Sequence, residues 1–218
     1  MQAAIFDMDG TLIDSMGYWR SVALEFLEEK GYEIPPELRQ WVRLNSVRST
    51  PAKFRQYFDI PETDAQMNAF FDARMAEHYR RDIGLKPHAL DYLEQLRGQG
   101  VTCVLATATW RTQTIPLMEK LGALKYFYRD GREYIVCRDE MGMMKSSDDY
   151  YPTLCARFAL RPDECVMFED ALYSMLTASR AGLHVWAIDD PTALPNRERI
   201  AEVAERRFAG WEELLERS

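Results

Sequence analysis

The chain has 218 residues, of which 47% are apolar and 28% charged, as in ordinary globular proteins. Its net charge of −8 argues against nucleic acid and anionic membranes as partners, because both require clustered lysine and arginine. The N-terminus shows no leader-like segment, and no apolar run is long enough to span a membrane. We therefore expect a cytoplasmic protein with reduced thiols; monomer and homodimer both stay open.

The first predicted element is a short buried strand over residues 3–6, "AAIF", which runs directly into two aspartates. Alternation in an extended chain would place Asp7 and Asp9 on the same side, and Gly10 indicates a turn after them. Like charges so close repel each other unless a positive charge lies between them. The sequence therefore predicts a cation at the end of this strand, supplied by the chain or by a bound metal.

Residues 15–84 carry the apolar periodicity of helices and contain no strand-like run. Two stripes follow helical spacing: Trp19, Val22, Ala23, Phe26 and Leu27 in the first, and Met67, Phe70, Phe71 and Met75 in the second. We predict an all-helical domain over 15–84, inserted into a core domain made of 1–14 and 85–218.

Apolar runs and helical segments alternate from residue 85 onward. The runs 101–107, 164–168 and 184–188 are mainly apolar and do not alternate with polar residues, as in strands covered on both faces, and a shorter run lies near Tyr134. Two helical segments between them end at Gly100 and Gly182. This order predicts an α/β fold with a doubly wound, Rossmann-like parallel sheet.

Polar side chains follow several of the predicted strands, at the edge where such sheets bind ligands. Asp7 and Asp9 follow the first strand, Thr107 and Ala108 the second, and Glu169 and Asp170 the third, while Lys145 lies in a loop between them. We expect one site made of two carboxylate pairs, a hydroxyl group and a cation.

These four segments, "DMDGT", "VLAT", Lys145 and "VMFEDAL", resemble the motifs of the haloacid dehalogenase-like hydrolase superfamily in their order and spacing. The helical insertion between the first two is similar to the small helical (C1-type) cap subclass, which includes phosphatases and β-phosphoglucomutase-like members. One departure is that the family usually continues the lysine with Pro-Asp, whereas this chain has Ser146 and Ser147.

The resemblance implies a phosphatase that acts on a small phosphorylated metabolite through an aspartyl-phosphate. Asp7 would be the nucleophile and Asp9 the general acid and base. Mg²⁺ would be the cofactor, held by Asp7, Asp170 and the Asp9 backbone carbonyl.

The remaining motif residues receive supporting roles from the same resemblance. Glu169 would orient the ligands, while Thr107, the Ala108 amide and Lys145 would bind the phosphate. The metal ion would then supply the positive charge between the aspartates. It would also allow this acidic protein to bind a dianionic phosphate ester.

Two alternatives share part of this pattern. A sugar-phosphate mutase would use the same motifs, but related mutases carry a histidine ten residues after the second aspartate, where this chain has Trp19. A non-enzymatic receiver-like module also combines acidic residues, threonine and lysine, but it lacks both an acid two positions after the phosphorylated aspartate and a helical insertion. Net phosphate release is therefore predicted, and the substrate ester stays open.

Overall fold

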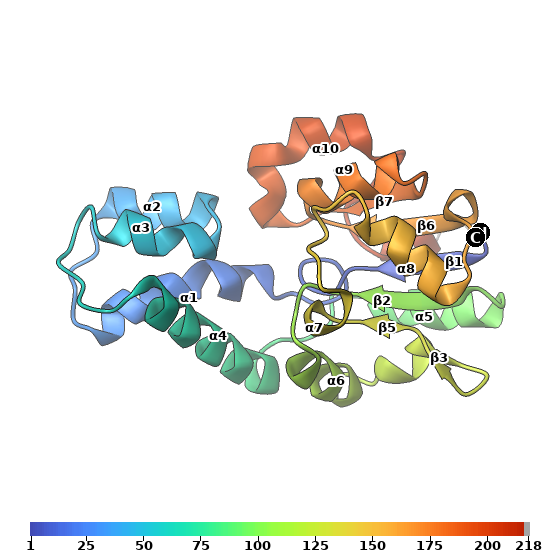
Figure 1. The fold of residues 1–218 in the computed structure, drawn as a ribbon, viewed down its shortest axis with the longest axis horizontal. Coiled ribbons are helices and arrows are strands. Elements are labelled where there is room, and N and C mark those ends of the chain that lie inside the picture. The colour runs from blue at the N-terminus through green and yellow to red at the C-terminus, as the bar shows by residue number, and fades with distance from the viewer. Residues whose placement is uncertain (216–218) are drawn as a thin grey trace. The chain divides into compact units, whose positions relative to one another are not determined.

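The computed structural model describes residues 1–215, which form two compact units (Figure 1). One unit joins Met1–Asp14 to the chain from Gly84 onward, and the other is Ser15–Ile83. The last three residues of the predicted 85–218 segment lie outside the described residues. Each unit has its own apolar core and is described separately.

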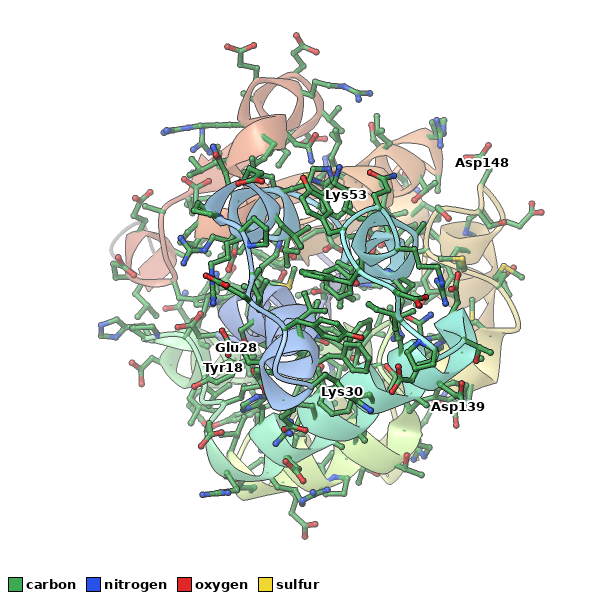
Figure 2. All side chains as sticks on the ribbon, turned by 90° about the vertical axis from the view of Figure 1, so that its left-hand side faces the viewer. Tyr18, Glu28, Lys30, Lys53, Asp139 and Asp148 are labelled. Atoms are coloured by element: carbon green, nitrogen blue, oxygen red, sulfur yellow. The ribbon has the colours of Figure 1, made fainter. Side chains whose placement is uncertain are left out.

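The unit Ser15–Ile83 is entirely helical. Its elements are α1 (Met16–Glu29), α2 (Pro36–Leu44), η1 (Val47–Ser49), α3 (Thr50–Phe54) and α4 (Asp64–Arg81). Phe26 of α1 packs with Phe71 of α4 across a core that excludes water, as the apolar stripes predict. Charged side chains such as Glu28 and Lys30 project from the outside of these helices (Figure 2).

The other unit is built on a six-stranded sheet in which every pairing is parallel. The strand order is β5 (Ile135–Val136), β2 (Thr102–Ala106), β1 (Ala3–Phe6), β6 (Cys165–Glu169), β7 (His184–Ile188) and β8 (Arg206–Phe208). A separate two-stranded hairpin pairs β3 (Tyr128–Arg129) with β4 (Arg132–Glu133). The doubly wound α/β fold is confirmed, and β8 and the hairpin are additions to it.

Helices and apolar side chains cover both faces of the sheet. The elements are α5 (Ala89–Gly98), α6 (Arg111–Lys120), η2 (Leu124–Phe127), α7 (Arg138–Met141), α8 (Tyr150–Phe158), η3 (Pro162–Glu164), α9 (Leu172–Arg180), η4 (Pro191–Asn196), α10 (Arg197–Val203) and α11 (Glu212–Leu215). On one face Ile5 and Met167 belong to the core formed with α8 and α9. On the other, Phe6 stacks on Phe168 with ring centroids 4.9 Å apart, beside Trp211. Burial on both faces explains why the strands read as continuous apolar runs.

The helix ends follow from local backbone chemistry. Gly100 and Gly182, which follow α5 and α9, have φ angles of 74° and 86°, a conformation that glycine adopts without steric cost. Pro152 is the third residue of α8, where its missing N–H leaves no helical hydrogen bond unmade. These ends fix where the loops at the carboxyl edge of the sheet begin.

Candidate active site

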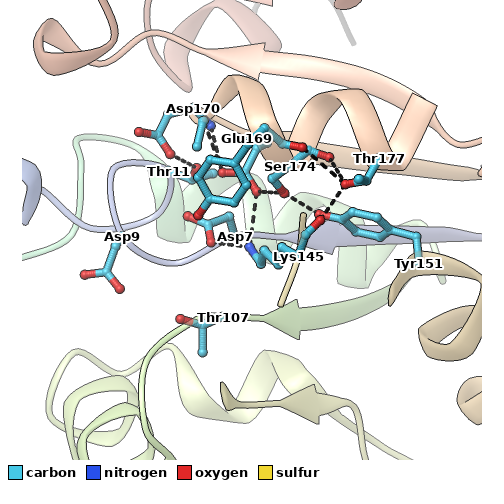
Figure 3. Close-up of polar contacts among 12 residues, drawn as sticks. Asp7, Asp9, Thr11, Thr107, Lys145, Tyr151, Glu169, Asp170, Ser174 and Thr177 are labelled. Carbon is cyan, nitrogen blue, oxygen red and sulfur yellow. Dashed lines mark hydrogen bonds and ion pairs between the residues drawn. The ribbon is translucent and has the colours of Figure 1, made fainter. Parts of the chain in front are cut away.

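The carboxyl ends of β1 and β6 bring the two acidic motifs together. Phe6 pairs with Phe168 in the sheet, so Asp7 and Glu169, the next residues of the two strands, lie side by side. The Asp7 backbone N–H donates to the Phe168 carbonyl at 3.0 Å. The parallel register therefore places two carboxylates of different motifs next to each other (Figure 3).

The loop after β1 is tighter than an extended chain. The strand ends at Phe6, and the Met8 carbonyl accepts backbone hydrogen bonds from the N–H groups of residues 11, 12 and 13. Gly10 has a φ of 86°, which this turn requires. β1 ends before Asp7 and the turn begins at Met8, so strand pairing does not by itself set the orientation of Asp7 and Asp9. The Asp9 carboxylate instead accepts a hydrogen bond from Thr109 Oγ1 at 2.7 Å.

Lys145 brings its charge to the buried acidic group. Its side chain is 2% exposed, and Nζ donates to Asp7 Oδ1 and, at 3.1 Å, to Glu169 Oε2. Burial alone would lower the Lys145 pKa, but the Asp7 and Glu169 carboxylates outweigh burial and hold it well above its usual value. The ammonium group therefore stays charged and bridges the nucleophile candidate to the second acidic motif.

Three buried carboxylates form the one group of possible metal ligands found among residues 1–215. Oxygen atoms of Asp7, Glu169 and Asp170 lie within 4.8 Å of one another. Burial, with the charge of Glu169 next, raises the pKa of Asp7 to about 8 although Lys145 opposes this. The same two causes raise the Asp170 pKa well above its usual value.

This group fits a divalent cation of the magnesium type. Three carboxylates face a single bound ammonium group, so their ionised forms leave uncompensated negative charge in a buried place. Mg²⁺ prefers hard oxygen ligands, which are what these side chains offer. A bound cation would favour the ionised carboxylates, because its charge offsets the burial and the repulsion that raise the pKa values of Asp7 and Asp170.

Glu169 is the most heavily hydrogen-bonded member of the group. Its Oε1 accepts from the backbone N–H groups of Asp170 and Ala171, at 3.3 and 3.2 Å. Its Oε2 accepts from Ser174 Oγ at 2.6 Å and from Lys145. A carboxylate held by donors on both oxygens is suited to orienting its neighbours.

Thr11, in the loop after β1, contacts Asp170 and is itself held by Trp211. Thr11 Oγ1 donates to Asp170 Oδ1 at 3.3 Å, while the Thr11 carbonyl accepts from Trp211 Nε1 at 3.1 Å. Thr11 belongs to the first motif, so its position in "DMDGT" could have indicated this contact. Trp211 lies 200 residues away, and only the fold reveals its contribution.

The loop after β2 forms a second set of contacts. Thr107 is buried, and its Oγ1 accepts from the Thr109 backbone N–H at 3.1 Å, while Ala108 is exposed at the loop. Thr109 thereby links Thr107 to Asp9, whereas Lys145 links Asp7 to Glu169. Thr109 lies two residues beyond the motif "VLAT", and nothing in the sequence indicated its role.

No helix within residues 1–215 is long and apolar enough to cross a membrane. A family model described as haloacid dehalogenase-like hydrolase matches residues 4–188. The chain is 25% identical over 192 residues to Protein CbbY of Rhodobacter capsulatus, and the matched region covers 85% of this chain and 84% of that protein.

Two further relatives extend over nearly the whole chain. The phosphorylated carbohydrates phosphatase of Thermotoga maritima is 25% identical over 212 residues, covering 93% of this chain and 94% of that protein. The crystal structure of a putative β-phosphoglucomutase from Thermotoga maritima superposes with a TM-score of 0.76 at 21% identity, covering 95% and 94% of the two chains. This last similarity concerns the fold.

Proposed function

The chain belongs to the haloacid dehalogenase-like hydrolases, and we propose that it is a Mg²⁺-dependent phosphatase of small phosphorylated metabolites that works through an aspartyl-phosphate. The observation that carries this proposal is the placement of Asp7. Its carboxylate lies at a strand end, held at one oxygen by Lys145 and adjoining the acidic pair Glu169 and Asp170. Asp9, two residues on, accepts a hydrogen bond from Thr109.

In the first half of the reaction, Asp7 attacks the phosphorus atom of the ester. An O–P bond to the carboxylate forms while the P–O bond to the leaving alcohol breaks, and the alcohol oxygen takes the bonding electron pair. Asp9 gives its proton to that oxygen, so the alcohol leaves neutral. The hydrogen bond from Thr109 fixes the direction of the Asp9 carboxylate for this transfer.

In the second half, water hydrolyses the aspartyl-phosphate. Asp9, now ionised, takes a proton from the water as the water oxygen bonds to phosphorus. The bond between phosphorus and the Asp7 oxygen breaks, which releases inorganic phosphate and restores the carboxylate. Asp9 is again protonated for the next ester.

The remaining motif residues neutralise and orient. We propose that Lys145, Thr107 and the Ala108 amide bind phosphate oxygens. Glu169 would orient the neighbouring ligand groups through its own hydrogen bonds. Asp7, Asp170 and the Asp9 carbonyl would hold Mg²⁺. When bound, the ion would offset charge on the phosphate oxygens and on the buried carboxylates.

The substrate class is a small-molecule phosphate ester. The relatives matched over most of the chain include a phosphorylated carbohydrates phosphatase, and one CbbY crystal structure is a complex with xylulose-1,5-bisphosphate. We propose that the helical unit is the cap of this subclass and that the unit built on the sheet supplies the chemistry. A phosphorylated sugar or a similar small metabolite is the first candidate.

A phosphate-release screen tests this function directly. Sugar phosphates, nucleotides and phosphonates are incubated with the protein in Mg²⁺ or in EDTA, with Asp7→Asn as the inactive control. We expect phosphate release from at least one ester, dependent on Mg²⁺ and absent in the control. Release that survives both EDTA and Asp7→Asn would contradict the proposal.

The same screen separates the phosphatase from a mutase. The position at which related mutases carry a histidine is Trp19, whose Nε1 donates to the Tyr79 hydroxyl at 3.2 Å within the helical unit. An indole ring has no group that titrates near neutral pH. We expect net phosphate release without a bisphosphate activator, and faster isomerisation of a hexose phosphate would favour the mutase.

A further inference from the structure

Two buried hydroxyl groups of α9 contact two different motifs of the candidate active site. Ser174 Oγ donates to Glu169 Oε2 at 2.6 Å, and Thr177 Oγ1 donates to the backbone carbonyl of Lys145 at 2.5 Å. Both side chains are 1% exposed or less. The two residues stand three positions apart, so they share one face of the helix. One helix face thus holds both the carboxylate of the acidic motif and the main chain of the lysine motif.

A third hydroxyl group, that of Tyr151 in α8, continues this contact. Its oxygen lies 2.5 Å from Ser174 Oγ in a fully buried position. Serine has one hydroxyl hydrogen, which Ser174 gives to Glu169, so Tyr151 must be the donor to Ser174. The hydrogen bonds therefore all run in one direction, from Tyr151 to Ser174 to Glu169 (Figure 3).

Lys145 completes the chain of contacts from the other side. Its Nζ shares Glu169 Oε2 with Ser174 and also donates to Asp7 Oδ1. Two aligned O–H dipoles stabilise the Glu169 charge without adding a positive group, and each bond in such a series strengthens the next. Lys145 is consequently not the sole partner of Glu169 Oε2 and can serve the nucleophile.

The loop that carries Lys145 needs support from outside its own backbone. Ser146 and Ser147 follow Lys145, so the loop lacks the rigid φ that a proline would give it at this point. The hydrogen bond from Thr177 to the Lys145 carbonyl fixes the backbone at this point. Support for the ammonium group thus comes from α9 on two sides, through the Lys145 carbonyl and through Glu169.

We infer that Tyr151 and Ser174 are positioning residues that act as a single unit, aiming Glu169 and through it Lys145 at the nucleophile Asp7. This inference rests on the proposed function. Because Tyr151 reaches Glu169 only through Ser174, its contribution disappears once Ser174 is gone. That dependence distinguishes a hydrogen-bonded series from two unrelated packing residues.

A double-mutant cycle tests the inference. Ser174→Ala, Tyr151→Phe and the double variant are compared with the unmodified protein for kcat and KM on the best ester of the phosphate-release screen. Losing a hydrogen bond to a charged group predicts roughly a tenfold lower kcat or more for Ser174→Ala, and a loss of a few-fold for Tyr151→Phe. We expect KM to change less than kcat, and the double variant to match Ser174→Ala within about twofold.

A matched control removes a hydroxyl group elsewhere in the same unit. Tyr126 donates to Glu94 Oε2 at 2.7 Å, outside the candidate active site, so Tyr126→Phe should keep the kcat of the unmodified protein. Tyr151→Phe deletes one oxygen atom only, so it remains informative if Ser174→Ala fails to fold. Unchanged kcat in Tyr151→Phe would overturn the inference, as would losses that multiply in the double variant.

Urea unfolding of the same four proteins separates failure of this inference from failure of the proposed function. If the unmodified protein releases phosphate from no ester, the proposed function fails, and the cycle is evaluated on the free energy of unfolding. A hydrogen-bonded series predicts that Tyr151→Phe destabilises the protein less when Ser174 is already alanine. Strictly additive destabilisation would reject the series.

Discussion

The two units of the chain differ in what they bury. The unit built on the sheet buries Asp7, Lys145, Glu169 and Asp170, each less than a tenth exposed. In the helical unit the ions stay at the surface, as in the Lys30–Glu62 pair, where the lysine side chain is 46% exposed. Burying a charge costs free energy unless it is paired, so a fold keeps buried charges mainly where chemistry requires them.

This difference separates two kinds of consequence. A change to any of these four groups should affect turnover, because each of them touches another at the candidate active site. A change to a surface pair should alter stability slightly and turnover hardly at all, because water and salt screen it. The following substitutions would break this contrast if their effects were similar in the two units.

Asp7→Asn should have the largest effect. Replacing the carboxylate by an amide removes the proposed nucleophile and one metal ligand, so we expect turnover to fall at least about 10³-fold. The fold should persist, because the substitution also removes one of the mutually repelling carboxylates. Phosphate release and thermal unfolding measure the two effects, and activity above roughly 1% would reject covalent catalysis by Asp7.

Asp9→Asn should be nearly as damaging for esters of ordinary alcohols. Loss of a general acid and base typically lowers the rate by about 10²–10⁴-fold. The first half of the reaction should be less affected with p-nitrophenyl phosphate, whose leaving group needs no proton. Rates measured on both esters test this, and equal losses in the first half would remove Asp9 as the acid.

Lys145→Met should lower the rate and the affinity for phosphate together. It also leaves Asp7 and Glu169 without their buried cation, so we expect a destabilisation of about 3 kcal/mol. Kinetics, inhibition by inorganic phosphate and urea unfolding report the three changes. Behaviour like that of the unmodified protein would mean that the third motif has been assigned to the wrong residue.

Asp170→Asn should act mainly on the metal. The variant keeps the shape of the side chain but loses a charge, so half-maximal activity should require roughly 10–100-fold more Mg²⁺. Mg²⁺ should also raise the melting temperature of the unmodified protein more than that of the variant, because ligands stabilise the state that binds them. An unchanged dependence on Mg²⁺ would exclude Asp170 as a ligand.

Lys30→Met should have the smallest effect and serves as the counterpart of Lys145→Met. Its ion pair with Glu62 lies at the surface of the helical unit, so its loss should cost less than about 1 kcal/mol. Turnover should stay within about twofold of the unmodified protein. A loss of activity comparable to that of Lys145→Met would show that the contrast between the two units is misplaced.

The sequence predicted the main strands and the site because both depend on short segments. β1, β2, β6 and β7 are mainly apolar runs without polar alternation, and polar residues follow the apolar part of each of the first three. β8 was not predicted, because Arg206 and Arg207 give it a polar pattern. The Arg206 Cζ atom lies 4.8 Å from the ring centroid of Trp186. Tertiary packing rather than local preference therefore stabilises this edge strand.

Other parts of the candidate site depend on contacts between distant segments. The turn at Gly10 ends the extended backbone close to Asp9, and the hydrogen bond from Thr109 to the Asp9 carboxylate comes from another segment. Ser174 and Tyr151 follow the acidic and lysine motifs closely, but each reads as an ordinary helix residue in the sequence. Their hydrogen bond joins α9 to α8, and only the packing of the two helices creates it.

Trapping the covalent intermediate tests the central claim most directly. The unmodified protein and Asp9→Asn are mixed with p-nitrophenyl phosphate and Mg²⁺, quenched in acid within one turnover, and digested for peptide mass spectrometry. The account predicts one phosphoryl group on Asp7, accumulating further in Asp9→Asn because hydrolysis of the intermediate is slowed. Phosphorylation of another residue, or burst release of p-nitrophenol with no phosphoryl group on the N-terminal peptide, would contradict it.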